Sequence, residues 1–445
     1  MRGSKLSIVL LVLVGIGCSG SSSSSNESDT TSPILHDTSG VDDQSDGVGG
    51  TDVTGPIAES FQVTWQSRDR LNPSAPLKFW RGDESATTPT DWTPNGLDCA
   101  NGCDVAPSLK ALVQVTSAGV DGSTLKLYGL NQLVPANGVE VSTKALSWRF
   151  DDIALYVMER ANDTFELYQI LFDNPGKRAL VGTFAPKEGI DSYQGTFLVR
   201  ANHVVLLHVS LGGAELYHLD MTNLGDGFQK LEPTIGNSQG TGSQFTEKEP
   251  FAISPDGKEV VFFSRGDNEF KIWLWSLSGG NPKNITLSES QLDACGSSSK
   301  LYYIANKAIF SPDSQQIYFS MTSQDSVSVT ESCSGYLDDQ FKCISNAQTK
   351  PETDILVIDR TLNPASLRNV TQNAKNDGTT NRVIDDFVVS PQGHHLVFIA
   401  SPEIGGNCRS HNDREIWRIS VDGSEIEMLS DDSGALPLSG TITAN

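Results

Sequence analysis

The feature that most constrains the fold is a repeated motif of two apolar segments joined by a short turn. Residues 251–263 read Phe-Ala-Ile-Ser-Pro-Asp-Gly-Lys-Glu-Val-Val-Phe-Phe, and residues 309–319 and 388–399 repeat the pattern. Proline fixes φ at the start of a turn, and glycine accepts the positive φ at its end. Each copy therefore predicts two antiparallel strands connected by a tight turn.

The same frame recurs along the chain, with weaker copies at residues 106–115, 149–157 and 200–207. A third strand follows in each unit, then a turn and a short fourth strand, and no stretch shows sustained helical periodicity. Tandem four-stranded units are typical of a β-propeller. We therefore predict an all-β fold, a β-propeller with six recognisable four-stranded blades. The third strands carry these residues at one common position: Tyr128, Tyr168, Tyr217, Trp273, Leu356 and Trp417.

The Ser-Pro-Asp-Gly turn, the aromatic third strand and the Gly-Gly-Asn turn at residues 279–281 together resemble the TolB-type propeller repeat. That repeat also occurs in the propellers of prolyl-oligopeptidase-like enzymes. Residues 251–287, 308–371 and 387–430 match it well, and the other three units match its frame. The resemblance implies a propeller fold and another envelope protein as a partner.

Two β-rich stretches precede the repeats, at residues 61–65 and 77–80. A propeller has to close its ring, because exposed strand edges invite pairing between molecules. We expect these stretches to pair with the C-terminal residues. They would either complete the sixth blade or form a composite seventh blade.

The first 17 residues have the pattern of a secretory signal peptide, with Arg2 and Lys5 before a short apolar run. The run ends in Leu-Val-Gly-Ile-Gly-Cys, which resembles the lipobox of bacterial lipoproteins. The resemblance implies that Cys18 becomes the acylated first residue. With Ser19 next to it, it also implies anchoring in the bacterial outer membrane, facing the periplasm or the cell exterior. A cleaved signal with a chance cysteine is the alternative.

Residues 18–55 are rich in Ser, Gly, Thr and Asp and contain no Lys or Arg. Such a segment buries too little apolar surface to fold, so it is predicted to be a flexible tether. The predicted organisation is a signal peptide (1–17), an acylated cysteine with its tether (18–55) and a propeller domain (56–445). The net charge of −23 argues against a nucleic-acid partner. Membrane contact is expected through the lipid anchor only.

Nearly all the extra sequence falls in connections that an antiparallel meander places at one end of the blades. These connections are residues 232–248, 288–306, 322–352 and 401–413, and we call this end the loop face. Long loops on a rigid scaffold commonly carry binding sites, with neutral variation of exposed loops as the alternative. The candidate binding residues are Asp293, Tyr336, Asp338, Asp339, Arg409, His411 and Asp413.

Six of the seven cysteines lie beyond Cys18, and an even number in an exported protein indicates disulfides. We favour local pairs Cys99–Cys103 and Cys333–Cys343, which leaves Cys295 with Cys408. No histidine lies at ligand spacing beside these cysteines, so no metal site is expected. No cofactor is expected either.

Two classes of function remain open. The leading hypothesis is a non-enzymatic binding or scaffold protein that presents the disulfide-stapled loop face to an envelope or extracellular protein, with a glycan as another ligand class. The alternative is a propeller enzyme, such as a lactonase, lyase or glycan hydrolase, with its site at the channel mouth. Asp386 and Glu249 are its candidate residues, and no catalytic residue is assigned.

Three histidines on neighbouring predicted strands, His203, His208 and His218, could converge. We interpret them instead as solvent-facing positions of those strands.

Overall fold

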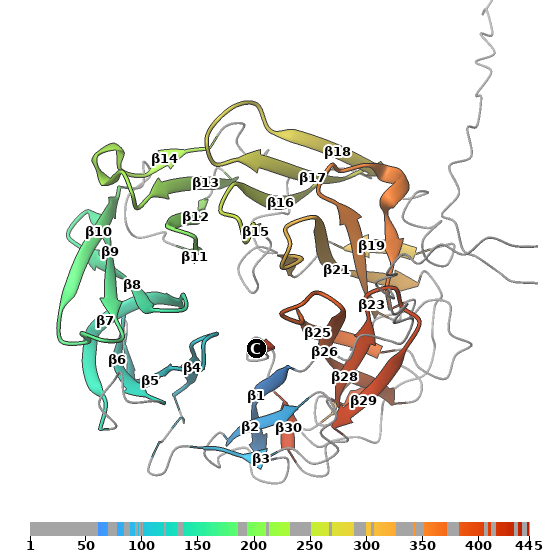
Figure 1. Ribbon diagram of the computed structural model, residues 1–445, viewed down its shortest axis with the longest axis horizontal. Helices are drawn as coiled ribbons and strands as arrows, with labels where there is room; N and C mark the ends of the chain where they lie inside the picture. Colours follow the sequence, from blue (N-terminus) through green and yellow to red (C-terminus); the bar gives the residue numbers. More distant parts are fainter. Residues whose placement is uncertain are drawn as a thin grey trace, which may run out of the picture.

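The computed structural model is an all-β molecule whose blades stand around a central axis (Figure 1). The predicted signal peptide, Cys18 and the tether lie outside the residues that the structure describes. Those residues are 61–69, 78–83, 90–93, 97, 99, 101–119, 122–130, 137–185, 194–210, 213–231, 251–266, 269–288, 300–303, 307–325, 341–343, 351–371, 382–404, 408–410, 415–430, 435–437 and 443–444.

Blades three to six are antiparallel meanders, as the repeats predict. Blade three is β11 (Gln194–Arg200), β12 (His203–Ser210), β13 (Gly213–Asp220) and β14 (Gln229–Lys230). Blade four is β15 (Phe251–Ile253), β16 (Glu259–Gly266), β17 (Glu269–Ser276) and β18 (Lys283–Ser288). Blade five is β20 (Ala308–Phe310), β21 (Gln316–Asp325), β23 (Pro351–Asp359) and β24 (Arg368–Asn369). Blade six is β25 (Arg382–Val389), β26 (His395–Ile404), β28 (Glu415–Ser420) and β29 (Ile426–Ser430).

Blades one and two share a strand. β7 (Val139–Phe150) is the outer strand of blade one up to Ala145 and the inner strand of blade two beyond it. At this crossing a Cβ atom on Gly122 would lie 2.5 Å from the carbonyl carbon of Lys144, so only glycine fits. The other strands are β4 (Cys103–Val105), β5 (Ala111–Gly119) and β6 (Gly122–Gly129) in blade one, and β8 (Ala154–Ala161), β9 (Thr164–Leu171) and β10 (Arg178–Phe184) in blade two.

The seventh blade is composite, which decides between the two ways of closing the ring. β1 (Gln62–Asp69) pairs on one side with β2 (Lys78–Asp83), and β2 pairs with β3 (Thr90–Asp91). On its other side β1 pairs with β30 (Ala435–Pro437) and β31 (Thr443–Ala444) from the C-terminus. The blue and red strands that meet in Figure 1 are this closure. The predicted pairing between the two ends of the domain is confirmed.

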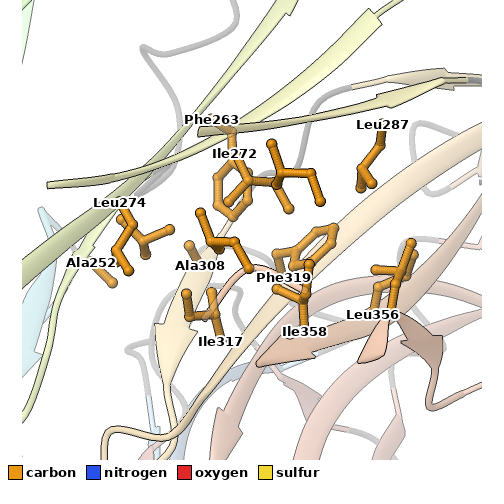
Figure 2. Packing of buried hydrophobic residues seen from close by; sticks show 14 of the residues in the cluster. Ala252, Phe263, Ile272, Leu274, Leu287, Ala308, Ile317, Phe319, Leu356 and Ile358 are labelled. Atoms are coloured by element: carbon orange, nitrogen blue, oxygen red, sulfur yellow. The ribbon is translucent and has the colours of Figure 1, made fainter. Parts of the chain in front are cut away.

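The core consists of apolar layers between neighbouring blades. Between blades four and five, Phe263 and Ile272 pack with Phe319, Leu356 and Ile358 (Figure 2). Similar buried clusters fill each of the other interfaces within the described part of the ring. Each fully buried Leu, Ile or Phe contributes about 1.5–3 kcal/mol, so these layers hold the blades in fixed positions. No described helix is long and apolar enough to cross a membrane.

The repeated turn also works as a joint between blades. In blade four the Oγ of Ser254 accepts hydrogen bonds from the N–H groups of Lys258 and Glu259 and donates one to Asp256. Gly257 has φ +67°, and a Cβ there would lie 2.7 Å from the Cβ of Ala201 in blade three. The turn therefore needs glycine both for its φ angle and for the close approach of the neighbouring blade.

Candidate functional site

Three of the four loops predicted to form the loop face contain described strands at one end of blades five and six. β19 (Lys300–Tyr303) comes from the loop before blade five and pairs with the far end of β21. β22 (Phe341–Cys343) comes from the insertion of blade five, and β27 (Cys408–Ser410) from that of blade six. β22 pairs with β27, which pairs with the end of β26. Backbone hydrogen bonding thus joins insertions of two blades into one small sheet, and the fourth loop, residues 232–248, lies outside the described residues.

The predicted binding residues are placed in part. Asp293, Tyr336, Asp338, Asp339, His411 and Asp413 lie outside the described residues. Arg409 is the central residue of β27, with Lys342 of β22 opposite it on one side and Glu403 of β26 on the other. The register therefore brings charged residues from both insertions to adjacent positions.

The cysteines are also placed in part. Cys99 and Cys103 form a disulfide with a Cα–Cα distance of 5.4 Å, which confirms that predicted pair. The carbonyl of Cys103 accepts a hydrogen bond from the side-chain amide of Gln66, so this staple lies between the seventh and first blades. Cys295 and Cys333 lie outside the described residues, and Cys343 and Cys408 are directly opposite each other in the pairing of β22 with β27.

An ion pair joins the inner parts of blades five and six. The Nζ of Lys307, just before β20, lies 2.8 Å from the Oδ1 of Asp386 in β25. Asp386 is only 5 % exposed, and its Oδ1 also accepts the N–H of Phe387 at 2.9 Å. A register shift in β25 next to Asp386 accompanies this placement. The candidate carboxylate of the enzyme hypothesis is therefore paired with the partly buried ammonium of Lys307, and Glu249 lies outside the described residues.

The histidines of blade three are not solvent-facing, so that interpretation is wrong. His203 and His218 converge: Nδ1 of His203 lies 3.0 Å from Nε2 of His218, on the side of the blade that faces blade four. Burial and the neighbouring His203 lower the pKa of His218 to about 4. His208 is on the other face, with its ring centroid 5.5 Å from that of Phe184 in blade two. Neighbouring blades cover both faces of a propeller blade. A polar residue in a central strand can therefore be buried between two blades.

Among the described residues, no group of three or more His, Cys, Asp or Glu side chains could hold a metal ion. Some of the described charged groups connect neighbouring blades, and others pair within one blade. Glu159, for example, accepts from the Oγ of Ser142 and pairs with Arg178 at 2.8 Å, joining the strand shared by blades one and two to β10. These contacts hold neighbouring strands of the ring together.

Sequence reasoning did not find Lys307. Its position just before an inner strand carries no local signal, because its partner Asp386 is 79 residues away in the chain. The sequence gives one indication: Asp386 lies in the innermost strand of blade six, and a carboxylate that is buried there needs a partner.

Solved structures with the same architecture are distant in sequence. A protein from Lactobacillus plantarum superposes with a TM-score of 0.50 at 12% identity, covering 87% of this chain and 100% of that one. The β-propeller domain of the Trilobed protease from Pyrococcus furiosus gives 0.46 at 10% identity, covering 84% and 95%. TolB from Acinetobacter baumannii gives 0.39 at 12% identity, covering 86% of this chain and 65% of TolB. No family model matches the chain, and no curated protein matches its sequence. The likeness is one of fold alone.

Proposed function

We propose that this chain is a non-enzymatic binding or scaffold protein whose loop face receives a protein of the bacterial envelope or the extracellular space. The observation that carries the proposal is the pairing of β22 with β27. It makes one surface from insertions of two neighbouring blades, whereas the turns at the opposite end of the blades are short. A glycan is another ligand class that such a surface could take.

The frame beneath this surface favours binding. Loops that are already hydrogen-bonded to one another lose less conformational freedom when a partner docks. The blades that carry them are fixed by fully buried side chains such as Tyr318 and Phe398. The register positions of Lys342, Glu403 and Arg409 supply charges of both signs, as expected for the polar rim of a protein interface.

The membrane anchor belongs to the same proposal. Acylation of Cys18 would hold the domain at the outer membrane, and residues 19–55 would let the loop face reach a partner at a distance. A Cys18→Ser variant should leave the membrane fraction and lose incorporation of a labelled fatty acid. Retention of the label in that variant would contradict the anchor.

The enzyme alternative gains no support from the described residues. Its candidate acid, Asp386, is 5 % exposed and is paired with Lys307 of the neighbouring blade. A hydrolytic activity that disappears in Asp386→Asn, with the fold retained, would be the result that revives it.

The proposal is tested by in-cell crosslinking and affinity capture with the full chain. In one variant residues 326–350 are replaced by a short Gly-Ser turn, which removes β22 and leaves β21 and β23 in place. The matched control is Asp173→Lys/Glu425→Lys, two exposed residues on turns at the opposite end of the blades. Circular dichroism checks that each variant folds.

We expect one envelope protein to be captured by the full chain and the control, and to be lost from the loop variant. The captured protein is then purified, and its Kd for the loop variant should be at least tenfold weaker. Equal capture by all three proteins would contradict the proposal, and glycan binding and hydrolysis would be examined next.

A further inference from the structure

We infer that Cys343 and Cys408 form a disulfide that covalently joins the insertion of blade five to that of blade six. The inference rests on the register of β22 and β27, in which the two cysteines are direct Cα partners, together with Phe341 opposite Ser410 and Lys342 opposite Arg409. It requires export to an oxidising compartment, and it does not require that the loop face bind a partner.

The register is compatible with the Cα–Cα spacing of a disulfide. Directly opposed residues of an antiparallel pair have Cα atoms about 4.5–5.5 Å apart and share one face of the sheet. Disulfides accept Cα–Cα distances of about 4.4–6.8 Å. The local pair Cys99–Cys103, at 5.4 Å, shows that this chain uses such a spacing elsewhere.

The sequence pattern alone favours a different arrangement, Cys333 with Cys343 and Cys295 with Cys408, because cysteines close in sequence commonly pair locally. β22 and β27 belong to loops of two blades, so their pairing brings together cysteines that are distant in the chain. A link between them closes a long loop, and long loops gain more from crosslinking than local ones in the chain-entropy account.

The chemistry is an ordinary thiol–disulfide exchange. The thiolate of one cysteine attacks a disulfide of an oxidised dithiol oxidoreductase, and a mixed disulfide forms. The second thiolate then attacks that bond and releases the oxidoreductase as a dithiol. One S–S bond forms between Cys343 and Cys408, two thiols lose their protons, and two electrons pass to the oxidoreductase.

The test is peptide mapping of the full chain, purified from cells that export it, under non-reducing conditions with free thiols blocked. Trypsin places the four cysteines on separate peptides: Cys295 on 284–300, Cys333 on 308–342, Cys343 on 343–360 and Cys408 on 383–409. We expect a linked species of 343–360 with 383–409 that disappears on reduction. Peptide 308–342 linked to 343–360, 284–300 linked to 383–409, or alkylated thiols at both Cys343 and Cys408 would overturn the inference.

Single substitutions give a second readout. Cys343→Ser should free the thiol of Cys408 for alkylation, Cys408→Ser should free that of Cys343, and neither should free Cys99 or Cys103. The matched control, Cys99→Ser, should expose only Cys103. If Cys343→Ser instead freed Cys333, the pairing would be the local one. Because these readouts need no partner, their failure is separate from a failure of the binding proposal.

Discussion

The ammonium of Lys307 lies 2.8 Å from the carboxylate of Asp386, and this ion pair links the inner parts of blades five and six. Both groups are mostly buried, with the Lys307 side chain 17% and the Asp386 side chain 4% exposed. The Lys307 ammonium also lies 5.8 Å from the ring centroid of Phe387. Breaking such a pair is costly because the charge that remains loses its ionic partner.

We therefore predict that Lys307→Met lowers the free energy of unfolding by about 3 kcal/mol or more. The double variant Lys307→Met/Asp386→Leu should lose less than Lys307→Met alone, since it removes both charges. The control is Lys258→Met, which breaks an exposed pair with Asp256 and should cost at most about 1 kcal/mol. Denaturant unfolding measures all three, and equal losses in Lys307→Met and Lys258→Met would refute a role for the buried pair.

Gly257→Ala should destabilise the joint between blades three and four. At φ +67° the alanine costs about 1 kcal/mol, and its Cβ would overlap that of Ala201, which adds about 1–3 kcal/mol. The comparison variant is Gly279→Ala, also at positive φ but with no atom within 4 Å of the new Cβ. Ala201→Gly relieves the positive φ of Ala201 (+48°) in any background, so it should stabilise Gly257→Ala by more than it stabilises the wild type. Thermal or denaturant unfolding is the measurement, and an equal gain in both backgrounds would show that the overlap is not the cause.

Ser314 takes the place of the turn glycine in blade five, at φ +61°. Its Oγ accepts a hydrogen bond from the N–H of Asp256 in blade four at 3.2 Å. This contact between blades offsets the cost of the strained backbone at Ser314. Ser314→Ala keeps the strain and loses the contact, and we expect it to cost about 1 kcal/mol. Ser314→Gly loses the contact but relieves the strain, so it should be less destabilising than Ser314→Ala. A larger loss of unfolding free energy in Ser314→Gly than in Ser314→Ala would contradict this explanation.

The stability of blade three should depend on pH through His218. Its folded pKa is about 4, below the ordinary 6.5, because burial and His203 disfavour the charged ring. Between these values the unfolded chain binds a proton that the folded chain does not, so stability falls as pH drops from about 6.5 towards 4. We expect the loss between pH 7 and pH 5 to be about 1 kcal/mol smaller in His218→Phe than in the wild type. Urea unfolding at the two pH values measures it, and an unchanged loss would rule out His218 as the group responsible.

Features of the fold that depend on residues close together in the sequence were predictable, and features that depend on distant residues were not. The turns around Ser254 and Ser311 were predictable, because proline, glycine and alternating apolar residues act within a few positions. The Cys99–Cys103 disulfide was predictable for the same reason. The continuous β7 was not, because no local signal at Ala145 separates the outer strand of blade one from the inner strand of blade two.

The candidate site was less predictable than the fold. The grouping of the long loops followed from the alternation of connections in a meander, which is a property of the topology. The partner of Asp386 and the burial of His208 and His218 depend on contacts between blades, where sequence distance gives no guidance. That Cys343 lies opposite Cys408 likewise becomes visible only when the strand register between the two insertions is known.

The central claim, that the loop face is a protein-binding surface, is tested most directly by site-specific photo-crosslinking in living cells. A photoreactive amino acid is placed at position 409 in β27, and in a separate strain at position 173 at the opposite end of the blades. The account predicts a crosslink from position 409 to one envelope protein and none to that protein from position 173. Crosslinks from both positions to the same proteins, or from position 173 alone, would contradict it.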